Sequence, residues 1–379
     1  MPIQPFTPDL EPKVQAFNDR LKAGGSHFVF PKTPVNVWLP KQNDAQRTFM
    51  EVFVTTDAEA SVRGGYVVKH QPYWVSGGDQ GGREQNVDNL QLPLSEGSVD
   101  PKYSGVSVQI LAHVQKKHPL LYCLGMGSLE NPLPLMLKAM GWTRVLVPFL
   151  FRVTRGKGFL RNINVLRTNA SRRLAADVLA YSGLGGLAFR PMHMALTRPS
   201  LERFTYVAEE VPGFDTWADA IWEEARPAYS LCANRTASEL ELLYPRSKEK
   251  FIRVRVSRAG KPVGWAVMFA TQMTKHKQFG AMKLGTVIDC LAVPGHEGAV
   301  VRAATRVLRK RKVDLVATNQ LHHAWVTAFK HAGFLTGPSN YVFASSKKLT
   351  AAIAPWGEAE LPQSRVHITR ADGDGPIHL

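Results

Sequence analysis

The feature that most constrains this chain is an order of expected elements that occurs twice along its 379 residues. Each copy has antiparallel strands, one further strand, a loop that leads into a helix, another strand, a second helix and a last strand. The second helix of each copy ends in glycine, which helix ends favour, and an aromatic residue follows: Gly141-Trp142 and Gly333-Phe334. Because the order of elements repeats more clearly than residue identity, the sequence predicts a structural duplication.

Hydrophobic periodicity places the expected elements. In the first copy, strands are expected at 49–54, 64–75, 90–94, 120–124 and 143–153, and helices at 104–117 and 132–140. In the second copy, strands are expected at 251–257, 263–270, 285–293, 314–318 and 341–345, and helices at 297–312 and 322–331. The sequence therefore predicts an α/β (α+β) fold with two domains, each a mixed, mainly antiparallel sheet flanked by helices.

Changes in composition along the chain predict five segments. These are an N-terminal arm at 1–47, a first domain at 48–153, a helical connector at 154–226, a second domain at 227–350 and a flexible tail at 351–379. The connector is rich in Arg and Gly, with one helix expected at 171–181 and another at 217–226. The tail is polar, which is typical of disordered segments.

The charge balance favours acidic partners. The chain has 47 Lys and Arg against 31 Asp and Glu, a net charge of +16, which suits phosphorylated cofactors, nucleic acid or an anionic membrane face. Its three cysteines are too few and too scattered for a disulfide framework, and no His, Cys and Asp set has zinc spacing. No secretory signal is visible, and the densest apolar run, 145–151, is far below the ~20 residues of a membrane span. We expect a soluble cytoplasmic protein without a metal.

In each copy, the loop between the third expected strand (90–94 or 285–293) and the following helix carries the functional signal. In the first copy it reads Lys102-Tyr103-Ser104-Gly105-Val106-Ser107, and in the second Gly295-His296-Glu297-Gly298-Ala299-Val300. With this element order, the chain resembles the GNAT (Gcn5-related) acyltransferases over 49–153 and 251–346. The tandem arrangement resembles the bacterial double-GNAT proteins, including the Fem-type aminoacyltransferases.

The resemblance implies where a cofactor binds. In GNAT proteins a loop of the form Gln/Arg-x-x-Gly-x-Gly/Ala holds the coenzyme A pyrophosphate on backbone N–H groups at a helix N-terminus, an intrinsic anion site. The first copy keeps the central Gly105, with Lys102 in the basic position and Ser107 in the last. The second copy has no basic residue there, and Glu297 would repel a pyrophosphate. We therefore expect acetyl-CoA or another acyl-CoA at residues 102–107.

Three polar residues are candidates for the chemistry. Glu96 follows the strand expected at 90–94 and precedes the loop, where a carboxylate can act as a general base; a solvated residue of a Ser-Glu-Gly turn is the alternative. Asp289 lies inside an apolar strand of the second copy and needs a buried partner, in a catalytic or a structural role. Asn319 occupies the place where the family often has an asparagine after the fifth strand.

The family's general acid has no counterpart. GNAT proteins often have a tyrosine four residues before the Gly-aromatic pair, and these places hold Leu137 and Phe329. Neither side chain can give a proton to a departing thiolate. Either another group protonates the sulfur, or the thiolate leaves unassisted, or neither half is a standard acetyltransferase.

Three functions fit these observations. The first is transfer of an acyl group, expected to be acetyl, from acyl-CoA to a small-molecule, sugar or peptide amine by direct attack, because no activated Cys or Ser is evident. The second is a Fem-like transferase that uses aminoacyl-tRNA, which the charge and the basic run at 302–312 favour. The third is a GNAT-fold binding protein without catalysis, which the missing tyrosines favour.

Overall fold

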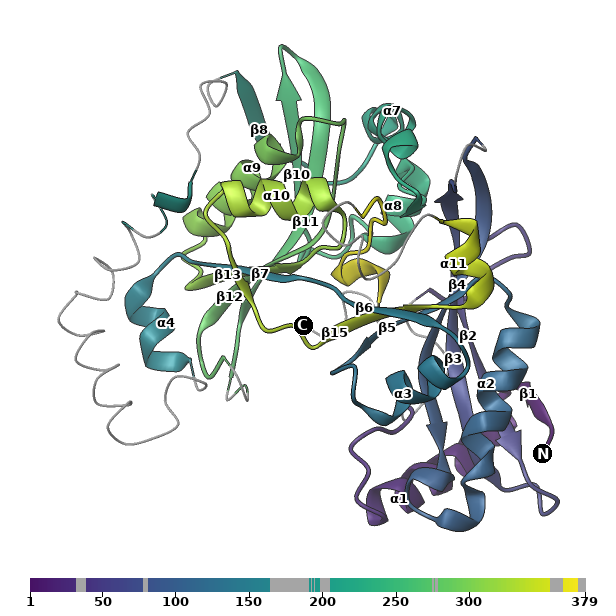
Figure 1. The fold of residues 1–379 in the computed structure, drawn as a ribbon. Helices are drawn as coiled ribbons and strands as arrows, with labels where there is room; N and C mark the ends of the chain where they lie inside the picture. The colour runs from purple at the N-terminus through teal and green to yellow at the C-terminus, as the bar shows by residue number, and fades with distance from the viewer. Residues whose placement is uncertain are drawn as a thin grey trace. The chain divides into compact units, whose positions relative to one another are not determined.

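The chain forms two compact units. Unit 1 comprises Met1–Leu146 and Val342–Gly357, and unit 2 comprises Val147–Tyr341 and Glu358–Leu379. The computed structural model describes residues 1–31, 39–77, 81–163, 191, 193, 195–197, 205–274, 276, 279–354 and 364–373 (Figure 1). The helix expected at 171–181 lies outside the described residues.

Unit 1 is built on a mixed sheet with the strand order β1-β2-β3-β4-β5-β15-β6. The strands are β1 (Ile3–Pro5), β2 (Phe49–Thr56), β3 (Val62–Val75), β4 (Arg83–Ser95), β5 (Leu121–Met126), β15 (Tyr341–Ser345) and β6 (Thr143–Leu146). The pairs from β1 to β4 are antiparallel, as is the β15–β6 pair, whereas β4 and β5 are parallel. The helices are α1 (Glu11–Ala23), α2 (Gly105–Lys117), α3 (Pro132–Ala139) and α11 (Lys347–Ala352).

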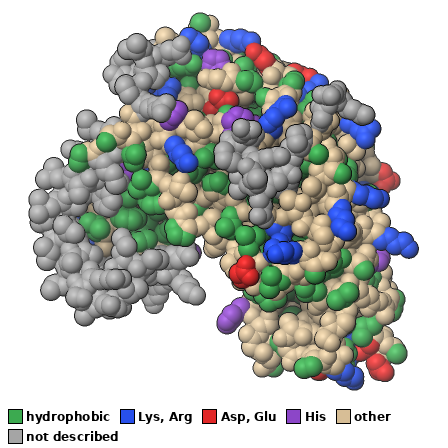
Figure 2. All heavy atoms as spheres, in the orientation of Figure 1, with side chains coloured by type: hydrophobic (Ala, Val, Ile, Leu, Met, Phe, Trp, Pro, Cys, Tyr) green, Lys and Arg blue, Asp and Glu red, His purple; other side chains and the backbone are tan. Residues whose placement is uncertain are grey.

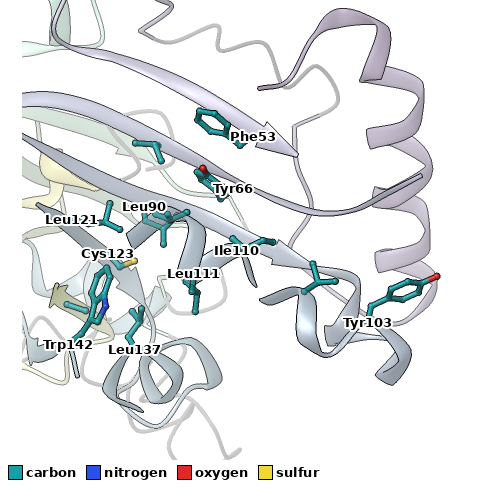
Figure 3. Packing of buried hydrophobic residues seen from close by; sticks show 14 residues of the cluster. Phe53, Tyr66, Leu90, Tyr103, Ile110, Leu111, Leu121, Cys123, Leu137 and Trp142 are labelled. Atoms are coloured by element: carbon teal, nitrogen blue, oxygen red, sulfur yellow. The ribbon is translucent and has the colours of Figure 1, made fainter. Parts of the chain in front are cut away.

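Helices cover both faces of this sheet. The buried side of α2 packs on one face together with Phe53, Tyr66 and Leu90 (Figure 3). The buried side of α1 belongs to a second cluster with Val54 and Val67, which alternate with the first set along the strands. The residues that α2 buries, Val106, Ile110, Leu111 and Val114, have helical spacing. Lys116 and Lys117 lie in its last turn, where cations favour the helix dipole.

Unit 2 repeats the plan with a seven-stranded sheet in the order β14-β7-β13-β12-β11-β10-β8. The strands are β14 (Leu335–Gly337), β7 (Phe149–Val153), β13 (Leu315–Asn319), β12 (Lys283–Ala292), β11 (Lys261–Gln272), β10 (Ile252–Arg258) and β8 (Tyr206–Glu210), with a short β9 (Leu231–Ala233) apart from them. The helices are α4 (Gly156–Asn162), α7 (Thr216–Ala225), α8 (Ala237–Leu243), α9 (Glu297–Lys310) and α10 (His323–His331). Again one pair, β12 with β13, is parallel.

Each unit contains a strand from the other half of the sequence. The single strand expected at 143–153 is two strands, because Pro148 has no backbone N–H with which to continue a ladder. The first piece, β6, stays in unit 1, whereas β7 lies between β13 and β14 of unit 2. In return, β15 from the C-terminal half lies between β5 and β6 of unit 1.

The C-terminal segment 364–373 differs from the flexible tail that the sequence predicted. Val366, Ile368 and Asp372 are fully buried, and the backbone N–H of Leu321 donates to the carbonyl of Ile368. Val366 and Ile368 alternate with His367 and Thr369 along this segment, and all four side chains are fully buried, so both of its faces are packed. Polar composition concealed the alternation because the neighbouring residues are Arg, His and Thr.

Candidate functional site

The parallel strand pair of each unit separates toward its carboxyl end. In unit 1, Asp88–Leu90 pair with Leu121–Cys123. Beyond these residues β4 and β5 continue to Ser95 and Met126 without pairing with each other in the described sheet. In unit 2, β12 and β13 pair only from Leu284 to Thr286 on the β12 side. Where parallel strands stop pairing, backbone N–H and C=O groups lose their ladder partners, and an extended ligand can pair with such groups.

A β-bulge lies in β4 and in β12, in each case just beyond the residues that pair with the parallel strand. In β4 the register shifts between Val67↔Gln91 and Gly65↔Leu94, so Leu92 and Pro93 together face a single residue of β3. Leu92 has a φ of 43°, in the left-handed region that non-glycine residues rarely adopt. In β12 the extra residue is Ile288. Bulges turn backbone N–H and C=O groups out of the ladder and often lie beside active sites.

The sequence contained one signal for the first bulge. Pro93 lies inside β4, and proline within a sheet is confined to edges, first positions and bulges. The second bulge has no such signal, since Ile288 is an ordinary strand residue.

The loop at 102–107 leads into the N-terminus of α2. Pro101–Tyr103 form a 3-10 turn in which the Asp100 carboxylate accepts from the N–H of Lys102. Ser104 precedes the helix, and no side chain caps this helix end within the described chain. Lys102, Ser104 and Gly105 are exposed, whereas Tyr103 and Val106 are buried in the core of unit 1. A Cβ atom at Gly105 would meet nothing within 4 Å, so the backbone is open to an approaching group.

The equivalent loop of unit 2 already holds a carboxylate. The Glu297 carboxylate accepts from the N–H of Gly295 at 3.0 Å. Burial raises the pKa of Glu297, and hydrogen bonds from its own N–H and from Gly295 oppose this rise. One donor of the loop is therefore occupied by a group that repels phosphate. The loop of unit 1 is therefore better suited than the loop of unit 2 to bind an anion.

Glu96 lies in a buried ion cluster. Its side chain is 5% exposed and accepts from Arg20 Nε at 2.8 Å and from Arg63 Nη1 at 3.0 Å. Arg20 belongs to α1 and Arg63 to β3, so the carboxylate joins the arm to the sheet within unit 1. Both carboxylate oxygens accept hydrogen bonds from the two guanidinium groups, an arrangement that suits a structural anchor.

Glu96→Gln separates these two roles. We expect the free energy of unfolding to fall by about 1–3 kcal/mol, because two guanidinium groups lose their charged partner. Urea unfolding followed by circular dichroism measures this loss, and Asp19→Asn, which removes an exposed carboxylate of α1, is the control. Unchanged stability together with an about 100-fold loss of acyl transfer would instead identify Glu96 as a base.

Asp289 lies at the centre of a second buried network. Its carboxylate accepts from Tyr244 Oη at 2.7 Å, and Arg235 Nε lies 2.8 Å from Oδ2. Arg235 also donates to Asp372 at 2.7 Å. All three charged side chains are at most 1% exposed. Burial raises the pKa of Asp289 to about 6, with Arg235 opposing and Asp372 reinforcing the rise.

Asn319 is buried at the end of β13. Its Oδ1 accepts from Arg370 Nη1 at 2.9 Å. Thr369 Oγ1, one residue before Arg370, lies 3.5 Å from Asp289 Oδ1. Residues 369 and 370 thus connect the two candidates of unit 2. The sequence did not indicate this link, because the polar composition of 351–379 is typical of a flexible tail.

The sequence-predicted residues fall into two groups. Glu96 and the loop 102–107 lie in unit 1, and Asp289 and Asn319 lie in unit 2. Leu137 and Phe329, in the family's tyrosine places, are both fully buried. A small pocket between β8, β10 and α9, lined by Tyr206, Ala208, Val256, Ala299, Arg302, Ala303 and Arg306, includes none of these candidates. No helix in the described part of the chain has the length and apolar content to cross a bilayer.

Comparison with known proteins identifies the fold. No family model and no curated protein matches the sequence. The structure is similar to the GCN5-related glucosamine N-acetyltransferase region of a fungal multi-domain GH3 β-N-acetylglucosaminidase, with 13% identity and a TM-score of 0.51 over 90% of this chain and 38% of that chain. It is also similar to a tandem GNAT protein from the clavulanic acid biosynthesis pathway, with 14% identity and a TM-score of 0.46 over 92% of this chain and 98% of that chain.

A further solved structure with this likeness is the N-myristoyltransferase of Saccharomyces cerevisiae, with 9% identity and a TM-score of 0.48 over 90% of this chain and 78% of that chain. The chain spans well under half the length of the fungal protein. The likeness to its GCN5-related region, together with the two repeated units, confirms the predicted tandem GNAT fold. At these identities the likeness concerns the fold.

Proposed function

We propose that this chain is an acyl-CoA-dependent N-acyltransferase whose acyl-CoA binds to unit 1. The observation that carries the proposal is the contrast between the two loops. The N-terminus of α2 has no side-chain cap and an open Gly105, whereas Glu297 occupies a donor of the other loop. A diphosphate gains from uncapped N–H groups and from the helix dipole, and Lys102 adds a positive charge.

The separated ends of β4 and β5 suit the rest of an extended cosubstrate. Acyl-CoA supplies an activated thioester carbonyl when bound. The backbone N–H of Leu92, in the bulge, is a candidate to stabilise the oxyanion that forms as an amine attacks, whereas Pro93 has no N–H to donate. The buried Leu137 offers no proton, so the proposal includes a thiolate that leaves unassisted or takes its proton from solvent.

The acceptor in this proposal is a primary amine. GNAT-fold neighbours include a protein described as acting on glucosamine, which makes amino sugars the first class to try, followed by amino acids and peptides. We expect the acyl group to be acetyl, and acyl-CoAs with longer acyl groups should be assayed beside acetyl-CoA. A cytoplasmic location is part of the same proposal.

A Fem-like transferase that uses aminoacyl-tRNA is the second candidate. The net charge of +16 and the exposed Arg306, Arg309 and Lys310 of α9 favour a polyanion. On the face shown in Figure 2, however, Lys and Arg side chains are spread over the described surface and do not gather in one patch. A concentrated basic face would suit tRNA better.

A direct assay tests the proposed function. The full chain is incubated with acetyl-CoA or longer acyl-CoAs and with amino sugars, amino acids or peptides, and both free thiol and acylated amine are measured. We expect stoichiometric release of coenzyme A and formation of an acylated amine. Acyl-CoA binding without turnover would support a binding protein. Salt-sensitive tRNA binding with no affinity for acyl-CoA would support the Fem-like alternative.

A further inference from the structure

Unit 1 contains a cluster of metal-ligating side chains that the proposed reaction does not use. His70 lies on β3, Asp88 on β4, and His118 directly follows α2. The strand register places His70 opposite Asp88. Asp88 Oδ1 lies 2.8 Å from His70 Nδ1, and its Oδ2 lies 2.8 Å from His118 Nδ1. One carboxylate therefore bridges two imidazole rings that are distant in sequence.

A second carboxylate orients the first ring. Glu51 on β2 places Oε2 2.9 Å from His70 Nε2. When an ion displaces the proton on Nδ1, a carboxylate at this position would keep the remaining ring proton on Nε2 and leave the lone pair of Nδ1 for the ion. Metal-binding histidines characteristically donate their other ring N–H to such a partner, which fixes the tautomer and the orientation of the ring.

We propose that His70, Asp88 and His118 bind a divalent transition-metal ion of the zinc type. Their ligand atoms all lie within 4.8 Å of one another, and the shortest contacts are 2.8 Å. These values bracket the separation of about 3.3 Å between ligands of a tetrahedral ion with bonds of about 2.0–2.1 Å. Imidazole and carboxylate are ligands that zinc accepts, and three protein ligands leave one position for water.

Burial and charge are consistent with this assignment. Asp88 and His118 are 8% and 4% exposed, so the packed core holds both of them. The side chains of His70 and Glu51 are 13% and 38% exposed, so the cluster borders solvent on their side. Asp88 and Glu51 bring two negative charges, which a divalent ion neutralises. Lys41 and Lys117 also face Glu51 and weaken the attraction.

Protons compete for the same site. Burial lowers the pKa of His70, but hydrogen bonds to Asp88 and Glu51 outweigh burial and raise the pKa to about 9. A cluster filled by protons alone is therefore the alternative that the experiment must separate from a metal site. Because metal binding displaces these protons, the titration is made at a mildly alkaline pH.

Calorimetry with Zn²⁺ tests the proposal independently of acyl transfer. The full chain is stripped with EDTA and titrated with Zn²⁺, and Co²⁺ reports the coordination by its visible d–d absorption. We expect His118→Gln to lose one Zn²⁺ equivalent and the Co²⁺ bands. His113→Gln, which changes a half-exposed histidine of α2, should keep both the Zn²⁺ equivalent and the Co²⁺ bands. Glu51→Gln, at the partly exposed edge of the cluster, should weaken binding by about 10- to 100-fold.

Two outcomes would overturn the metal site. One is a wild-type chain that binds no more Zn²⁺ than His118→Gln binds. The other is equal loss of binding in His113→Gln, which would indicate adsorption to exposed histidines. If His118→Gln does not fold, the comparison of wild type with Glu51→Gln decides, since that substitution leaves the three ligands in place.

Discussion

Gly105→Asp is expected to weaken acyl-CoA binding by about 10- to 100-fold while the fold is kept. A new carboxylate at this helix end would face the diphosphate, and like charges a few ångströms apart near a protein surface repel by a few kcal/mol. One factor of ten corresponds to about 1.4 kcal/mol. The helix itself should not suffer, since an acidic residue at a helix N-terminus is favourable by about 0.3–1 kcal/mol.

Two matched substitutions make this result specific. Gly105→Ala adds a Cβ atom that meets nothing within 4 Å, so its affinity should equal that of the wild type. Gly298→Asp makes the same charge change in the loop of unit 2 and should leave affinity for acyl-CoA unchanged. The dissociation constants come from calorimetry with acetyl-CoA. Equal weakening by Gly105→Asp and Gly298→Asp would mean that net charge, and not the loop of unit 1, governs binding.

Arg235→Met should cost about 3–5 kcal/mol of the free energy of unfolding of unit 2 at neutral pH. The substitution leaves Asp289 and Asp372 buried without a cation, and removing one partner of a buried ion pair typically costs this much. Lys261→Met, which breaks an exposed pair with Glu224, should cost about 0–1 kcal/mol. Urea unfolding of both variants measures the difference.

The loss in Arg235→Met should also depend on pH. The folded pKa of Asp289, about 6, lies above the unfolded value of about 3.9, so the folded state holds more protons between them. The contribution of Asp289 to the free energy of unfolding is fully present below the unfolded pKa and is lost as the pH rises through the folded pKa. Arg235 lowers the folded pKa of Asp289, so removing Arg235 should raise that pKa further. The free energy of unfolding that Arg235→Met loses relative to the wild type should therefore be smaller at pH 5 than at pH 7.

Removing both carboxylates together with Arg235 tests whether uncompensated charge causes the loss of stability in Arg235→Met. Arg235→Met combined with Asp289→Asn and Asp372→Asn removes the uncompensated charges and should recover part of the stability. No recovery, with a deficit that is equal at pH 5 and pH 7, would attribute the loss to lost packing of the Arg235 side chain and contradict the electrostatic explanation.

Element order could be predicted from sequence because each element has its own local signal. The buried positions of α2 have helical spacing, and Gly141 and Gly333 have φ values of 80° and 79° that glycine tolerates. The exchange of β7 and β15 could not be predicted. Strand partners depend on contacts between residues nearly 200 positions apart, and a strand carries the same alternation whichever sheet it joins.

The candidate site was only partly visible in the sequence. The loop at Gly105 carried a motif, and Glu297 was recognisable as a group that opposes phosphate. The partners of Glu96 and Asp289 were not predictable, because Arg20 and Arg235 are two of many basic residues with no local pattern that identifies them. The cluster of His70, Asp88 and His118 was missed for a similar reason: its members come from different strands and a helix end and lack any short spacing.

A crystal structure of the full chain with bound coenzyme A would show directly which loop holds the diphosphate. We expect one diphosphate on the backbone N–H groups of residues 105–107, beside Lys102, with the pantetheine arm between the diverging ends of β4 and β5. A diphosphate at the N-terminus of α9, or a chain that stays empty at saturating coenzyme A, would contradict this expectation.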